Sequence, residues 1–113
     1  MSRIYEKFVT SSFVESYKRY KNLQNRIDKK ADQIMKNPYH NTEVLGKQEV
    51  DLRGLRSARI GRNFRIIFGV CEECRAKRFH EKNILFCKHC EDKEDESVVF
   101  LTVGTHKRAY QLK

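Results

Sequence analysis

Four cysteines carry the clearest chemical signal in this 113-residue sequence. They form two C-x-x-C pairs, Cys71 with Cys74 and Cys87 with Cys90, separated by twelve residues. Thiolates at this spacing fit a tetrahedral zinc ion held between two tight turns. Two disulfides or a redox pair are the competing interpretations, and a reducing cytosol disfavours the disulfides. We therefore predict one structural zinc ion per chain, with no open coordination position and hence no catalytic metal.

The predicted metal also has a structural purpose. Residues 71–97 form an insertion between an apolar run that ends at Val70 and another that begins at Ser97. A connection this long without its own core is unusual in a compact domain. Its large apolar residues are only Phe79, Ile84, Leu85 and Phe86. Zinc crosslinking would supply the missing stability. His80 or His89 could replace a cysteine as ligand, but we expect each to lie at the surface.

Arginine recurs at every third position between residues 53 and 65, a period that fits neither a helix nor a strand. The five residues are Arg53, Arg56, Arg59, Arg62 and Arg65. The segment "IGRN", residues 60–63, has the chemistry of a turn between two strands. We therefore expect the arginines to lie on different elements of a hairpin.

Strand alternation sorts these arginines by face. The apolar residues that should face the core are Ala58 and Ile60 on the first strand and Phe64, Ile66, Phe68 and Val70 on the second. Arg59 and Arg65 then share the opposite face, which we expect to be open. Arg56 has the core-side parity, which predicts an edge or structural arginine, and Arg62 lies in the turn. From this stretch alone, a solvated basic face is the simpler interpretation.

The segment after the last predicted strand gathers groups that transfer protons and stack. In "GTHKRAYQLK", His106, Lys107, Arg108 and Tyr110 fall within five residues. Histidine exchanges a proton near neutral pH, and tyrosine can hydrogen-bond or stack. A lone histidine in such a segment is usually a surface residue, but the position of His106 just after a predicted strand favours a role in proton transfer. Beside arginines, these groups suit phosphodiester chemistry in which the 2′-hydroxyl of RNA attacks the adjacent phosphate.

Other elements must position these groups. "RIYEKFVT" alternates like a short strand, Ser12 and Glu15 predict a capping box that opens a helix, and "NP" at 37–38 ends it. Residues spaced alternately three and four positions apart form a stripe on one side of the helical segment, and this stripe should face the core. They are Phe13, Tyr17, Tyr20, Gln24, Ile27, Ala31 and Ile34. The stripe fits one long helix or a hairpin of two. Residues 39–50 are expected to form a loop, and "SVVFLTVG" the last strand.

Bulk composition limits the class of protein. The length predicts a single domain over residues 1–113. A formal net charge of +9 favours a polyanionic partner such as nucleic acid or an anionic membrane face. No apolar run approaches the roughly 20 residues of a membrane span, and the N-terminus has no signal-peptide pattern. We expect a cytoplasmic protein with no membrane partner.

The order of elements along the chain resembles the RelE/ParE toxin superfamily, especially its RelE- and YafQ-like ribonucleases. The order is a strand, a helical segment, the hairpin "LRGLRSARIGRNFRIIFGV", a strand and the ending "GTHKRAY". The resemblance covers nearly everything except residues 71–97. Its most specific pieces are the "R-x-G-x-x-x-R-I-I-F" hairpin and the "V-G-T-H…Y" ending. The resemblance implies an α+β fold in which a helical hairpin packs on a small, mainly antiparallel sheet. It also favours two helices over one long helix between residues 12 and 36.

The resemblance further implies a toxin of a type II toxin–antitoxin system that cuts messenger RNA in the ribosomal A site without a catalytic metal. Arg65 matches the family arginine that contacts the scissile phosphate, and Arg59 lies near the basic residues of the first hairpin strand. His106 matches a proton-transfer histidine, and Tyr110 an aromatic that positions the substrate base. Further RNA contacts are assigned to Arg56, Arg62, Lys107 and Arg108. An acidic cognate antitoxin should lie across the Arg59/Arg65 side.

Two other functions fit parts of this pattern. ParE-like members have the same fold and poison DNA gyrase without a full acid–base set, so His106 and Tyr110 beside Arg65 favour the nuclease. A non-catalytic RNA-binding zinc module is the other alternative.

Overall fold

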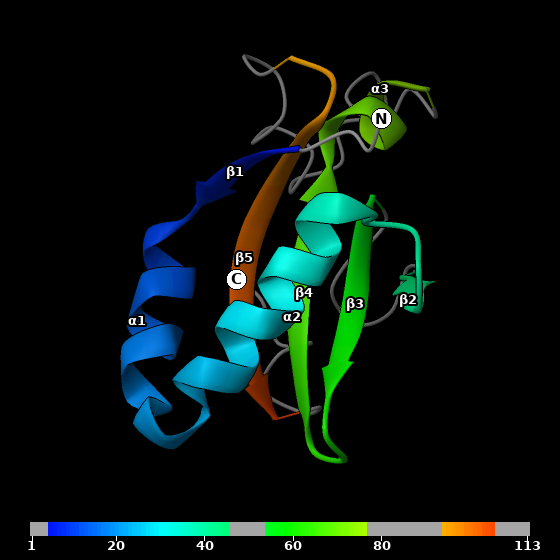
Figure 1. Ribbon diagram of the computed structural model, residues 1–113. Coiled ribbons are helices and arrows are strands. Elements are labelled where there is room, and N and C mark those ends of the chain that lie inside the picture. The colour runs from blue at the N-terminus through cyan, green and yellow to red at the C-terminus, as the bar shows by residue number, and fades with distance from the viewer. Residues whose placement is uncertain (1–4, 46–53, 77–93, 106–113) are drawn as a thin grey trace.

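A five-stranded mixed sheet organises the chain in the computed structural model, which describes residues 5–45, 54–76 and 94–105. The strands are β1 (Glu6–Val9), β2 (Thr42–Val44), β3 (Leu55–Ile60), β4 (Phe64–Val70) and β5 (Ser97–Thr105). Their order across the sheet is β1-β5-β4-β3-β2 (Figure 1). β1 is parallel to β5, and the other neighbouring pairs are antiparallel. The predicted α+β class with a small, mainly antiparallel sheet is confirmed.

Two helices rather than one connect β1 to β2, as expected. They are α1 (Ser11–Arg19) and α2 (Gln24–Lys36), with a 3-10 turn, η1 (Lys21–Leu23), between them. Tyr20 leaves the helical region with φ −103° and ψ 60°, which breaks the helix without glycine or proline. α2 ends before the Asn-Pro pair, as predicted.

The cap of α1 differs from the prediction by two residues. Thr10, in extended conformation, accepts a hydrogen bond from the Phe13 amide at 3.2 Å. Its hydroxyl also donates to the Leu101 carbonyl of β5 at 3.0 Å. Ser12 already lies inside the helix, so the predicted capping box is wrong. Thr10 rather than Ser12 is the cap, because its side chain both caps the helix and hydrogen-bonds to the sheet.

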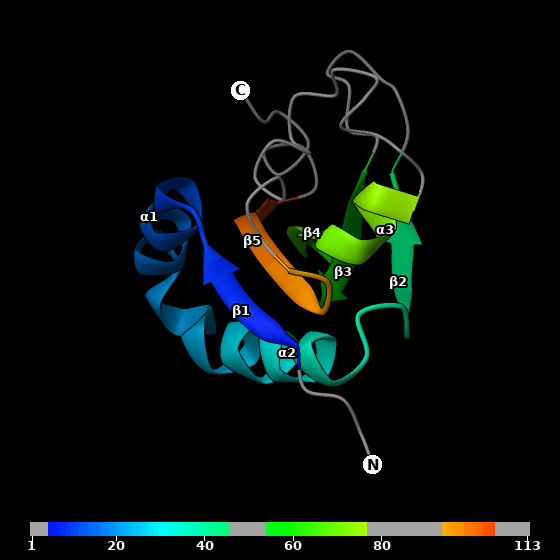
Figure 2. The ribbon, with the colours of Figure 1, turned by 90° about the horizontal axis from the view of Figure 1, so that it is seen from above.

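One face of the sheet is covered by α1 and α2, and this is where the main core lies (Figures 1 and 2). The core includes the predicted helical positions Phe13, Ile27, Ala31 and Ile34 and the predicted strand positions Ala58, Ile60, Ile66, Phe68 and Val70. Tyr17, Tyr20 and Phe64 pack against it, partly buried. The aromatic residues of the stripe are thus core residues, as predicted.

The opposite face of the sheet is also largely buried, which corrects the expectation of an open face. Ile67 is 0% exposed and Ser57, its register partner on β3, 2%. The next row brings together Leu55, Gly69 and Val99, and both apolar side chains are buried. Burying apolar area releases about 25 cal/mol per Å², so a face with these side chains is stabilised by being covered.

Two short elements were not expected from the sequence. β2 lies within the predicted loop 39–50 and pairs with Arg56–Ala58 of β3. A one-and-a-half-turn helix, α3 (Cys71–Ala76), follows β4 directly, at the end of the sheet where β5 begins (Figure 1). The start of the predicted insertion is therefore a helix packed on the domain. In the parts of the chain described here, no helix is long and apolar enough to cross a bilayer.

Candidate active site

Arg59 and Arg65 lie directly opposite each other on β3 and β4. They are register partners in the antiparallel pair, and Arg65 is in turn the partner of Gly104 on β5. Side chains of directly opposed residues leave the same face with Cβ atoms about 4.5–5.5 Å apart. The predicted sharing of one face by the two arginines is confirmed. Gly104 completes the row without a side chain.

Neither of these two arginines has a counter-ion among the described residues. No ion pair or hydrogen bond of either guanidinium is found there, and the Arg65 Nε atom is buried with no hydrogen-bond partner. Like charges directly opposite each other are destabilising, and an unmet buried donor costs about 1–3 kcal/mol. An oxyanion between the guanidiniums would relieve both costs, because the arginine fork matches the geometry of phosphate.

The accessibility of the two arginines differs in a way that suits anion binding. Arg59 is exposed and Arg65 half-buried, while Ile67 and Ser57 in the next row are fully covered. The Arg59/Arg65 pair therefore lies where this face meets solvent. Arg62 lies in the turn between the two strands, as predicted, and is exposed.

The predicted residues of the "GTHKRAY" ending lie outside the described part of the chain. They are His106 and Tyr110, predicted for proton transfer and base positioning, and the predicted RNA contacts Lys107 and Arg108. His106 follows Thr105 in the sequence, and Thr105 is the register partner of Phe64, the residue before Arg65. Their roles stay predictions.

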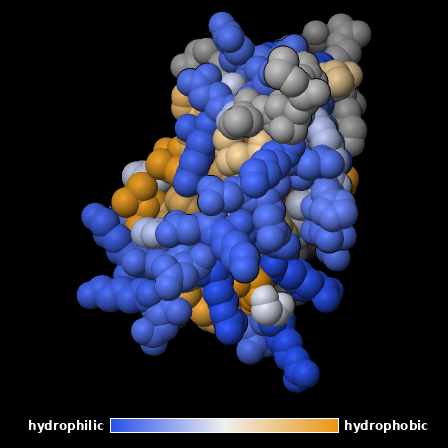
Figure 3. Space-filling model, in the orientation of Figure 1, coloured by the Kyte–Doolittle hydropathy of each residue, from blue (hydrophilic) through white to orange (hydrophobic). Residues whose placement is uncertain are grey.

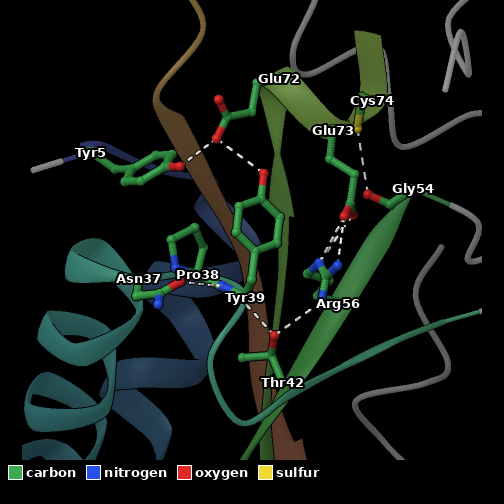
Figure 4. A network of polar contacts seen from close by, with 10 residues as sticks. All are labelled: Tyr5, Asn37, Pro38, Tyr39, Thr42, Gly54, Arg56, Glu72, Glu73 and Cys74. Carbon is green, nitrogen blue, oxygen red and sulfur yellow. Dashed lines mark hydrogen bonds and ion pairs between the residues drawn. The ribbon is translucent and has the colours of Figure 1, made fainter. Parts of the chain in front are cut away.

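Arg56 has a structural environment, as its parity predicted, which weakens its assignment as an RNA contact. Its guanidinium donates from Nε to both carboxylate oxygens of Glu73 at 3.1 and 3.0 Å, and from Nη2 to Oε2 at 2.6 Å (Figure 4). The same group donates to Thr42 Oγ1 at 3.2 Å and lies 4.8 Å from the centre of the Tyr39 ring. Arg56 and Glu73 are only 12% and 8% exposed. Their charges satisfy each other, so Arg56 is not available to an anion in this arrangement.

Glu72 extends this network to the other edge of the sheet. Its carboxylate accepts hydrogen bonds from the hydroxyls of Tyr5 and Tyr39, the latter at 3.0 Å (Figure 4). Partial burial, and then the hydrogen bond to Glu72, raises the pKa of Tyr39. The two glutamates are the middle residues of "CEEC", so the sequence that suggested only a metal motif also connects α3 to Tyr5 before β1, to Tyr39 before β2 and to Arg56 on β3. Sequence reasoning missed this role, because nothing local in the sequence shows the partners.

The first two predicted zinc ligands are buried on α3. Cys71 is 0% and Cys74 2% exposed, and Cys74 Sγ lies 3.4 Å from the Gly54 carbonyl oxygen. Three residues apart in a helix, they lie on the same side of it, whereas a zinc knuckle was expected to be a tight turn. Cys87 and Cys90 fall outside the described residues. Within the described ranges no three potential ligands come together, so the four-cysteine site stays a prediction.

No protein-family model and no curated protein matches this chain. Among solved structures, a chain from the crystal structure of the toxin–antitoxin complex RelBE2 of Mycobacterium tuberculosis has a TM-score of 0.59 at 17% identity, covering 91% of this chain and 92% of that one. A conserved hypothetical protein of Helicobacter pylori, solved in solution, has a TM-score of 0.47 at 12% identity, covering 92% of this chain and 97% of that one. The first similarity shows that the fold occurs in a toxin–antitoxin complex, which does not by itself fix an activity.

Proposed function

We propose that this protein is the toxin of a toxin–antitoxin pair and cuts messenger RNA on the ribosome. The observation that carries the proposal is the Arg59/Arg65 pair, two arginines directly opposed in the sheet register and without a counter-ion in the described structure. Supporting it are the fold shared with a chain of a toxin–antitoxin complex and the "GTHKRAY" ending. A solvated basic face explains neither the burial of Arg65 Nε nor the placement of like charges opposite each other.

In the proposed reaction, the 2′-hydroxyl oxygen of the substrate attacks the adjacent phosphorus, and the bond from phosphorus to the 5′ oxygen breaks. A base takes the proton of the 2′-hydroxyl, and an acid protonates the leaving 5′ oxygen. The products are a 2′,3′-cyclic phosphate and a 5′-hydroxyl. Arg59 and Arg65 would stabilise the negative charge that accumulates on the phosphate oxygens.

The remaining roles rest on the resemblance to RelE-like toxins. His106 would transfer a proton and Tyr110 would position the base, while Arg62, Lys107 and Arg108 would contact neighbouring phosphates. The inhibitor would be a small acidic antitoxin segment across the Arg59/Arg65 pair, since complementary charge favours binding to a cationic site.

Primer extension on messenger RNA from translating ribosomes tests the proposal. Cuts within codons are expected with the wild-type protein, and the products should carry the cyclic phosphate. Arg65→Ala should lower the cleavage rate about 10²–10³-fold, as expected for loss of a charge-stabilising donor, and His106→Ala about 10²–10⁴-fold.

Two controls make the result specific. Arg62→Ala removes an exposed arginine from the same hairpin and should lower the rate far less. Arg65→Lys keeps the charge but not the bidentate fork, so it separates charge from geometry if Arg65→Ala is poorly folded. Normal cutting of a substrate with a 2′-deoxy sugar at the cleaved bond would contradict the mechanism. Intact message together with trapped gyrase–DNA complexes would support the ParE-like alternative.

A further inference from the structure

A second cationic feature lies on the helical side of the fold, between α2 and the turn that joins β3 to β4. It is a shallow groove of about 330 Å³, which we call the α2 groove. Its cationic lining residues are Arg26, Lys29, Lys30 and Arg59, and its apolar floor includes Ile60 and Gly61. Hydrophilic side chains dominate the surface over α2 in Figure 3. The groove was not anticipated from the sequence, although its three helical cations follow an i, i+3, i+4 spacing.

The four cations of the α2 groove have no counter-ion among the residues described. None of them takes part in an ion pair or hydrogen bond there. Asp28, on the same helix, accepts a hydrogen bond from the Tyr17 hydroxyl of α1 at 3.0 Å and lines a different, apolar hollow. Concentrated like charge destabilises a compact state unless a partner neutralises it. The groove is therefore a concentration of positive charge that a multiply charged anion would neutralise.

Two placements connect this groove to the Arg59/Arg65 pair. Arg59 belongs to both. A side chain placed on Gly61 would come within 3.7 Å of the Arg26 Nη1 atom, so the Arg26 guanidinium reaches the hairpin turn. Cationic residues therefore extend from Arg59, at the edge of the Arg59/Arg65 pair, to the hairpin turn and α2.

The lining of the groove favours a nucleic acid over an acidic protein segment. A protein partner needs buried apolar anchors for most of its binding energy. Among the described residues that line the groove, the only large apolar one, Ile60, is 6% exposed. The exposed large apolar side chains of the described residues are Val9, Val14, Tyr39 and Val44, and none of them lines the groove. Charge without anchors is the pattern of phosphate-backbone binding.

We propose that the α2 groove binds the phosphodiester backbone of single-stranded RNA and holds the strand that enters or leaves the Arg59/Arg65 pair. For the link to cleavage, this inference rests on the proposed function, whereas backbone binding itself does not. Each neutralised phosphate of a single strand adds about 0.7 to the slope of log affinity against log salt, which is about 5-fold in affinity at 0.1 M salt.

The test measures binding of a 12-nucleotide oligouridine with 2′-O-methyl sugars, which the proposed reaction cannot cut, by fluorescence anisotropy at several salt concentrations. The variant Arg26→Gln/Lys29→Gln/Lys30→Gln should lose affinity on the order of 100-fold at 0.1 M salt, and its salt slope should fall by about 2. Glutamine keeps the helix propensity of these positions, and circular dichroism checks the fold.

The matched control removes the same charge from exposed residues at the end of α1 and the following turn, Lys18→Gln/Arg19→Gln/Lys21→Gln. It should lose much less affinity and keep the salt slope. Equal losses in the two variants would overturn the inference, because only bulk charge would then matter. Unchanged RNA binding with lost binding of a 12-residue oligoglutamate would overturn it in favour of a protein partner.

The groove inference and the proposed nuclease function can fail separately. If the wild-type protein binds the oligonucleotide through the groove but never cuts messenger RNA, the nuclease proposal fails and the groove inference stands. If it cuts messenger RNA and the groove variant cuts and binds as well as the wild type, the groove inference fails alone.

Discussion

Removing the Glu73 side chain should destabilise this protein strongly, because it would leave a charged guanidinium buried and unpaired. Arg56 is 12% exposed and directs three hydrogen bonds at the Glu73 carboxylate, at 2.6 to 3.1 Å. Removing one partner of a buried ion pair costs about 3–5 kcal/mol. The contacts of Arg56 with Thr42 and the Tyr39 ring would persist, but neither supplies a negative charge. We therefore expect Glu73→Ala to lower the free energy of unfolding by about 3–5 kcal/mol.

Urea denaturation followed by far-ultraviolet circular dichroism measures this loss. With a denaturant slope of about 1–3 kcal/mol per molar urea, the midpoint should fall by at least about 1 M. The double variant Arg56→Met/Glu73→Leu should recover most of the loss, because replacing both partners of a buried pair by apolar residues is often neutral. A double-mutant cycle then isolates the coupling energy.

The matched control is an exposed ion pair that also involves α3. Arg75 and Asp95 lie 2.7 Å apart and are 33% and 66% exposed. Exposed pairs contribute about 0–1 kcal/mol, so Asp95→Asn should shift the midpoint little. A loss below about 1 kcal/mol for Glu73→Ala would refute the reasoning, since the pair would then behave as a solvated one and Arg56 would regain its place as a candidate RNA contact.

Three further outcomes are expected. Elemental analysis of protein purified without added metal should give about one zinc per chain, as a closed four-thiolate site requires; two disulfides and no metal would contradict the four-cysteine prediction. Because the folded state raises the pKa of Tyr39, the unfolded state loses that proton first, and stability should fall as the pH rises above the ordinary tyrosine value of about 10. Tyr39→Phe should reduce this alkaline loss relative to wild type in urea titrations between neutral pH and pH 11, and identical pH profiles would exclude the effect. Thr10→Ala should cost about 1 kcal/mol or more through loss of the helix cap, whereas Ser12→Ala should cost almost nothing; the reverse order would reinstate the capping box.

The sequence by itself determined the features that depend on neighbouring residues. The turn chemistry of "IGRN" and strict strand alternation place Ala58 and Ile60 in the core and, by the same parity, Arg59 and Arg65 on one face. The Asn-Pro pair ends α2 where steric conflict before proline requires it. Such features are decided within a few residues of chain, so a single sequence contains enough to predict them.

The tertiary structure decided what depends on segments far apart in the chain. The sequence shows Glu73 only as part of a cysteine motif, yet its carboxylate meets Arg56, seventeen residues away, because α3 folds back on the sheet. Thr10 became the cap of α1 because β5 offers it a second hydrogen bond. The expected open face is buried for the same reason, since strand parity tells which side chains share a face and not what packs on it.

The candidate site also combines features that the sequence predicts with features that only the folded structure decides. Parity predicted that Arg59 and Arg65 share a face, but the register that opposes them and the burial of Arg65 Nε are properties of the assembled sheet. The α2 groove exists only because α2 and the end of β3, more than twenty residues apart in sequence, bring their cations together. The sequence gives the number of charged residues, whereas the packing of the elements decides how densely those charges gather on the surface.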